Sequence, residues 1–266
     1  MNVSYRICRV VSSYDEAELF VKFYNMRLKK EFTLFPIYCD RMKKNWLVIS
    51  GHGKQISSFA AIYLKNCSNS KPNTSWLNFG FGYKKNLKVS KLFFIDEVFE
   101  LNSKKKLYPS IINTNFIHRT AIYTVPTYKN YLSIFQDLHS YYFYKTVSKF
   151  CNQELLAVLK VSSNLKEKDN ITLRYKLIKD NFNKILKMES TLKKYSKLEG
   201  SYLNKPLYYD EITNLYHFTV SQKNELVTLL RMWNNFNYYN LINKIKNLKN
   251  TKLVLDFLRS EIKKVT

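Results

Sequence analysis

The spacing of apolar residues predicts alternating strands and helices at the start of the chain. Residues 5–12 are rich in β-branched side chains and predict a first strand. Ser13 and Glu16 have the spacing of a capping box, and the apolar residues that follow recur at helical intervals. We therefore expect a helix over residues 14–31, directly after the first strand.

The following hundred residues predict more extended segments, separated by one long irregular stretch. The segments with strand-like composition are 33–38, 45–50, 116–125 and 141–147. Residues 55–115 contain a loop rich in Ser, Asn and Pro and a basic loop, and they are interpreted as an insertion. Pro126 and Thr127 are expected to open a second helix.

Beyond Phe150 the pattern changes to long helices. Apolar residues recur every seven positions at Ile171, Ile178, Ile185 and Leu192. A packed helical hairpin is favoured over a long coiled coil, which would need more heptads and cleaner flanking charges. A final short helix is expected near residues 253–262.

The order of these elements predicts an α+β fold, a ferredoxin-like split β-α-β sheet with a long inserted hairpin. An α-helical C-terminal extension follows this sheet. Two domains are expected: residues 1–150, with the insertion at about 55–115, and residues 151–266.

Charge narrows the choice of partner. The chain carries 44 Lys and Arg against 20 Asp and Glu, a net charge of +24, which calls for an anionic partner such as nucleic acid or acidic lipid. No membrane partner is expected, because charges interrupt every apolar stretch well before about 18 residues. Abundant Lys, Asn, Ile, Phe and Tyr indicate A+T-rich codons, as in an organellar gene or an A+T-rich virus or plasmid.

The motifs of common enzymes and cofactor sites are incomplete. The four cysteines are widely separated, with no zinc-ligand spacing. Gly53 and Lys54 suggest a phosphate loop, but that fingerprint needs glycine at Val48 and Ser or Thr at Gln55. We therefore expect no enzyme, no cofactor, no metal and no small-molecule substrate.

Several segments, in order, resemble the ribosomal small-subunit protein S-ten family. The segments that carry this resemblance are 5–10 with 14–15, 35–37, 46–52, 116–119 and 125–129. The resemblance covers roughly residues 5–150. It departs where Gly51 replaces the family proline, at the enlarged hairpin tip, and after Phe150, where the family has no counterpart.

The resemblance implies a structural component of the mitochondrial small ribosomal subunit head, in the mitochondrial matrix and organelle-encoded. Its partners would be small-subunit ribosomal RNA and neighbouring head proteins, with a basic hairpin as the RNA anchor. The expected RNA-binding residues are Arg6, Arg9, Arg41, Lys43, Lys44, His52, Lys54, His118, Arg119 and Lys129. Two alternatives remain: a DNA-binding replication protein of an A+T-rich virus or plasmid, and a soluble accessory subunit of a respiratory complex.

Overall fold

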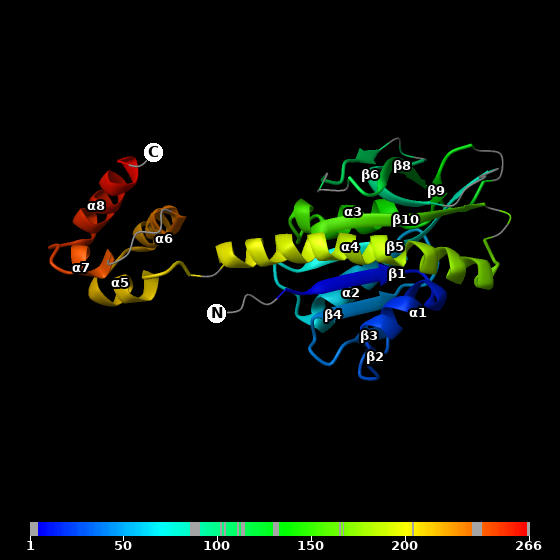
Figure 1. The fold of residues 1–266 in the computed structure, drawn as a ribbon, viewed down its shortest axis with the longest axis horizontal. Coiled ribbons are helices and arrows are strands. Elements are labelled where there is room, and N and C mark those ends of the chain that lie inside the picture. Colours follow the sequence, from blue (N-terminus) through cyan, green and yellow to red (C-terminus); the bar gives the residue numbers. More distant parts are fainter. Residues whose placement is uncertain are drawn as a thin grey trace. The chain divides into compact units, whose positions relative to one another are not determined.

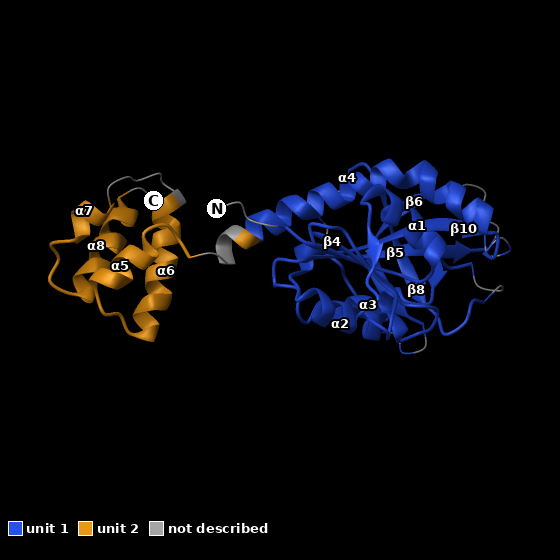
Figure 2. Ribbon diagram, turned by 90° about the horizontal axis from the view of Figure 1, so that it is seen from below, with its two compact units in different colours: residues 1–199 blue, residues 200–266 orange. Residues whose placement is uncertain are grey.

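The structure of the chain is a computed structural model. It describes residues 5–85, 91–101, 103, 105–110, 112, 115–129, 133–164, 166, 168–203, 205–235 and 241–264. The chain divides into two compact units, residues 1–199 and residues 200–266 (Figure 2).

The first unit is built around one mixed sheet (Figure 1). Its elements in chain order are β1 Ile7–Val11, α1 Tyr14–Phe23, β2 Arg27–Leu28, β3 Ile37–Cys39, β4 Asn45–Ile49, α2 Ile56–Ser68, β5 Ser75–Lys84, β6 Leu92–Glu100, β7 Lys106–Leu107, β8 His118–Thr124, β9 Gln136–Asp137, α3 Ser140–Val147, the 3-10 helix η1 Gln153–Leu155, β10 Leu156–Asn164 and α4 Ile171–Leu203. β1 lies between β4 and β5 and is parallel to both. The antiparallel strands β3 and β2 continue the sheet beyond β4.

Part of the sheet closes into a barrel. β10 pairs in parallel with β5 and antiparallel with β6. β6 then pairs with β8, β8 with β9, and β9 returns to β5 through Tyr83 and Gln136. This circle of pairings leaves both edges of β5 and β10 occupied, which suits strands whose residues are almost all buried.

Helices cover both faces of the sheet, and the alternation of side chains along β1 shows why. Ile7 and Val11 pack in a core with residues of α1 and α4, whereas Cys8 and Val10 pack in a second core with residues of α2 and α3. Figure 2 shows α4 and α2 on opposite sides of the strands. A strand buried on both faces must be apolar at nearly every position, as β1 is.

The second unit is helical and has its own core. Its helices are α5 Tyr209–Leu215, α6 Val220–Asn235, α7 Leu241–Ile245 and α8 Thr251–Lys263. Leu226, Leu230 and Trp233 of α6 are fully buried against residues of α5, α7 and α8. No helix in the described parts of the chain is long and apolar enough to cross a membrane.

The predicted ferredoxin-like split β-α-β sheet with an inserted hairpin is wrong. Residues 55–115 were interpreted as an insertion, but they supply α2, β5 and β6, and β5 is a central strand of the barrel. Its sequence, Ser75–Lys84, includes two glycines, which lowered the strand signal. The glycines are needed there because neighbouring side chains lie where a Cβ would be placed.

Two further elements differ from the sequence prediction. Residues 141–147 were expected to be a strand, yet they form α3, with Tyr141, Tyr144 and Val147 buried on one face. The strand β10 was not predicted. The sequence boundary lay after Phe150, whereas the compact units divide after Glu199, and both β10 and much of α4 pack in the first unit's cores.

Candidate functional site

A pocket of about 380 Å³ lies where several strands of the first unit end. Its walls come from the segments that follow β4, β8, β9 and β10. The C-terminal end of β5 and the first turn of α4 complete the lining. The lining residues are His52, Tyr83, Pro126, Thr127, Tyr128, Leu138, Lys168, Asp169 and Arg174. In sheets with parallel strands, ligands commonly bind in such a crevice at the strand ends.

Arg174 is held against the pocket by two carboxylates from α1. Its Nη2 lies 3.0 Å from Oε1 of Glu16, and its Nε lies 3.0 Å from Oδ2 of Asp15. Glu16 was predicted to cap its helix by reaching back to Ser13. It instead accepts hydrogen bonds from the backbone N–H and the hydroxyl of Ser12, both at 2.7 Å. The guanidinium is thus fixed before any ligand arrives.

The pocket lining also contains an aromatic pair. The rings of Tyr83 and Tyr128 meet edge to face with centroids 4.9 Å apart, and the Lys168 Nζ lies 5.7 Å from the Tyr128 centroid. Burial raises the pKa of both tyrosines, so their hydroxyls stay protonated at neutral pH. The pair offers apolar ring surface and hydroxyl groups, which are suited to contact with a planar ring.

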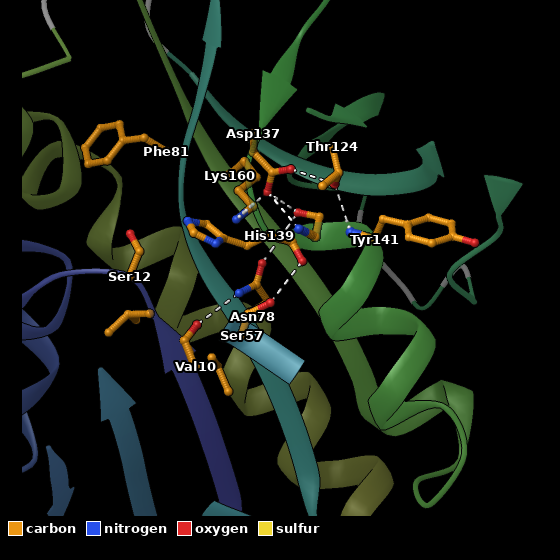
Figure 3. Close-up of polar contacts among 12 residues, drawn as sticks. Val10, Ser12, Ser57, Asn78, Phe81, Thr124, Asp137, His139, Tyr141 and Lys160 are labelled. Atoms are coloured by element: carbon orange, nitrogen blue, oxygen red, sulfur yellow. Dashed lines mark hydrogen bonds and ion pairs between the residues drawn. The ribbon is translucent and has the colours of Figure 1, made fainter. Parts of the chain in front are cut away.

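A buried charged network lies beside this pocket (Figure 3). Asp137 accepts a hydrogen bond from the Thr124 hydroxyl at 2.9 Å and lies 3.1 Å from the Lys160 Nζ. The Lys160 and Asp137 side chains are at most 1% exposed. Burial alone would raise the pKa of Asp137. The charge of Lys160 and the hydrogen bonds that Asp137 accepts outweigh this effect and lower the pKa.

His139 connects the network to the pocket. Burial lowers the pKa of His139 to about 4, so the imidazole is neutral at pH 7. Its Nδ1 lies 3.3 Å from the Gly53 carbonyl oxygen, which assigns the ring proton to Nδ1 and leaves Nε2 as an acceptor. Its ring lies 6.1 Å, centroid to centroid, from that of His52, which lines the pocket.

The structure separates most of the residues expected to bind RNA. Arg9 is completely buried in an ion pair with Glu189, and Arg6 donates to the backbone carbonyls of Ser68 and Asn69. The Lys54 Nζ lies 2.8 Å from Glu100. These cations serve the fold.

The remaining expected residues lie at three places. His52 lines the pocket, while Arg41, Lys43 and Lys44 lie in the turn between β3 and β4. His118 and Arg119 begin β8 and are exposed, and the backbone N–H of Lys129 donates to the Gln136 side chain. β8 is not a neighbour of β4, so the segments that carry these cations do not pair to form the expected basic hairpin.

Sequence reasoning missed the buried polar residues of this site. Lys160 carried a usable signal, because it is a single charge within the apolar run Leu155–Val161 and a buried lysine requires a partner. Glu16 and Arg174 are far apart in the sequence, and no sequence signal indicated that they form a pair. In the described segments no three His, Cys, Asp or Glu side chains are placed to hold a metal ion.

Known proteins resemble this chain in structure but not in sequence. The sequence matched no protein-family model and no curated protein sequence. Among solved structures, the chain is similar to the 5′-methylthioadenosine/S-adenosylhomocysteine nucleosidase from Colwellia psychrerythraea in complex with adenine. That match has a TM-score of 0.57 and 13% identity, and covers 71% of this chain and 96% of that chain.

Two more solved structures are similar to this chain over most of its length. The corresponding nucleosidase from S. pneumoniae matches with a TM-score of 0.54 and 13% identity over 71% of this chain and 98% of that one. Futalosine hydrolase from Helicobacter pylori matches with a TM-score of 0.50 and 11% identity over 74% and 96%. The chain therefore has the fold of these nucleosidases.

This fold overturns the resemblance to the ribosomal S-ten family and the function and partners inferred from it. The ribosomal role, its alternatives, the ribosomal RNA and head-protein partners, and the exclusion of an enzyme and of a small-molecule substrate are all corrected with it. The matched segments were short runs of common residues, which recur by chance in a chain of this composition. Location in the mitochondrial matrix stays a prediction.

Proposed function

We propose that the first unit binds a nucleoside in the pocket and hydrolyses its N-glycosidic bond. The observation that carries this proposal is the position of the pocket, which opens at the strand ends of a barrel shared with nucleosidases. One of those nucleosidases was solved with adenine, a planar base of the kind that the Tyr83 and Tyr128 pair would accommodate.

The polar groups are suited to the remaining parts of a nucleoside. The neutral His139 would help to align His52, and imidazole nitrogens bind sugar hydroxyls well. Asp169 lines the pocket, is exposed, and takes part in no ion pair among the described residues. It is the carboxylate best placed to receive a proton in the reaction.

The reaction can be written with these groups. The oxygen of a water molecule bonds to the anomeric carbon as the carbon–nitrogen bond breaks, and the bonding electrons pass to the base nitrogen. Asp169 accepts a proton from the water, and the Lys168 ammonium donates one to the departing base. Transfer of a proton from Asp169 to Lys168 through solvent restores both groups.

The test separates binding from hydrolysis. The purified full chain is incubated with 5′-methylthioadenosine, S-adenosylhomocysteine, adenosine and inosine, and base release is followed by chromatography, while calorimetry measures binding. Asp169→Asn should lower the rate by about 10²-fold or more with little change in binding. Asp180→Asn, an exposed change on α4 away from the pocket, is the matched control and should leave the rate unchanged.

Absence of both binding and base release with every nucleoside would contradict the proposal. Binding without base release would contradict the proposed hydrolysis and leave only a nucleoside-binding site.

A further inference from the structure

A second pocket, of about 460 Å³, lies at the edge of the sheet away from the barrel. There β2, β3 and the turn from β3 to β4 meet. We call it the cationic pocket. Its lining residues are Asn25, Arg27, Lys29, Cys39, Asp40, Arg41 and Lys43. It shares no lining residue with the pocket described above.

The backbone around the cationic pocket is fixed by hydrogen bonds. Arg27 pairs with Cys39 across β2 and β3. The following turn has Lys43 in the left-handed region at φ 53°, and its N–H donates to the Asp40 carbonyl at 3.1 Å. The arginine and lysine positions are therefore set by strand pairing and by the turn.

The single carboxylate of the cationic pocket is already used by this turn. Asp40 Oδ1 accepts from the backbone N–H groups of Lys44 at 2.8 Å and Asn45 at 2.9 Å. Its Oδ2 accepts from the Asn45 side chain at 2.8 Å. Asp40 is thus oriented toward the backbone and forms none of the described ion pairs.

The cations are left largely uncompensated. Among the described ion pairs, none includes Arg27, Arg41 or Lys43, and Lys29 has only a pair at 3.4 Å with the exposed Glu31. Four cations gathered around one concavity repel one another, and an anion bound between them removes that repulsion. Arginine supplies paired N–H donors that match phosphate oxygens, whatever the pH.

We propose that the cationic pocket binds a compact ligand carrying two or three linked phosphate groups. Several phosphates are needed to balance the four cations. The concave shape favours a compact anion over an extended nucleic-acid backbone, which would contact a stripe of charges on an open surface. The proposal does not depend on nucleoside hydrolysis in the other pocket.

Calorimetry of the full chain with tripolyphosphate tests the proposal. Arg27→Gln combined with Arg41→Gln should weaken binding by about tenfold or more, because each replaced side chain loses charge-assisted hydrogen bonds. The control is Lys176→Gln combined with Lys179→Gln, which removes the same charge from exposed positions of α4 and should change affinity by less than about twofold. Lys43→Gln alone should give an intermediate loss, and melting curves show that each variant is folded.

Further arms distinguish the source of the phosphate. One arm measures binding of the chain to vesicles that contain phosphatidylinositol bisphosphate. If tripolyphosphate displaces these vesicles, the cationic pocket also accepts phosphate carried by a lipid. Equal losses in the pocket and control variants, or no binding of tripolyphosphate at low salt, would overturn the proposal. So would tighter, pocket-dependent binding of a single-stranded RNA.

Discussion

Arg9 of β1 and Glu189 of α4 form an ion pair in which both side chains are completely buried. The Arg9 Nη2 lies 2.7 Å from Oε2 of Glu189, and the Tyr24 hydroxyl donates to the same oxygen. Burial alone would lower the pKa of Arg9, but the charge of Glu189 outweighs it and raises the pKa. The pair joins α4 to the first strand across 180 residues of sequence.

Removing either partner should destabilise the first unit strongly. Glu189→Gln leaves the Arg9 charge buried without a counter-charge, which costs about 3–5 kcal/mol. Arg9→Met combined with Glu189→Leu should recover most of this loss, because no buried charge remains. Urea denaturation measures the free energy of unfolding, and Glu18→Gln, which breaks the exposed pair with Lys22, is the control with a loss of about 0–1 kcal/mol. Equal effects of Glu18→Gln and Glu189→Gln would contradict the prediction.

The first part of the fold could be predicted because its local signals agree with its tertiary structure. The strand at Ile7–Val11, the start of α1 at Tyr14 and the strand at Asn45–Ile49 all lie where hydrophobic spacing placed them. The final helix Thr251–Lys263 was also confirmed. These elements have clear start signals and apolar residues at the period of their own type.

Other elements could not be predicted, because their burial is decided by distant partners. The aromatic run Tyr141–Tyr144 has high strand propensity, yet it forms a helix because the helical face packs on α2. β6 contains Asp96 and Glu97 and lies within the stretch 55–115 that was interpreted as an insertion. Pairing with β8 and β10 makes this segment a strand, and no local pattern records that pairing.

Of the residues that line the candidate site, only His52 was singled out from the sequence, and it was expected to bind RNA. Its other members come from segments that the sequence analysis treated as insertion, helix or extension, such as Tyr83, Leu138 and Arg174. The wrong topology placed these segments apart, so their side chains were never considered together. A correct strand order was required before the pocket could be recognised.

Replacing Gly82 by alanine should destabilise the barrel. A Cβ at this position would overlap the ring of Phe135, which is nearly buried beside β5. We expect a loss of about 1–3 kcal/mol from overpacking, measured by urea denaturation. Shortening the neighbour in Gly82→Ala combined with Phe135→Leu should restore part of the stability. If the double variant is less stable than the sum of the two single changes, the overlap is not the cause.

Acid should destabilise the protein through His139. Its pKa in the folded chain lies near 4, below its ordinary value of 6.5, so between these values the unfolded chain binds a proton that the folded chain does not. The contribution of neutral His139 to the free energy of unfolding is therefore fully present above pH 6.5. It falls as the pH approaches 4, by up to about 1.4 kcal/mol per pH unit. Denaturation across this range should show a shallower fall for His139→Gln. The exposed His118→Gln is the control, and a slope unchanged in His139→Gln but reduced in His118→Gln would refute this origin.

Replacing Gly80 by alanine should impair the pocket without unfolding the protein. A Cβ there would lie 2.9 Å from Oε1 of Glu16, so the carboxylate must move and its pairing with Arg174 is weakened. Because Arg174 lines the pocket, nucleoside affinity measured by calorimetry should fall by about tenfold, the equivalent of one charge-assisted hydrogen bond. Glu16→Gln, which weakens the same pair without a steric change, should lower affinity to a similar extent. Loss of affinity in Gly80→Ala alone would instead assign the effect to a shift of β5, since the Glu16 pairing would then play no part in binding.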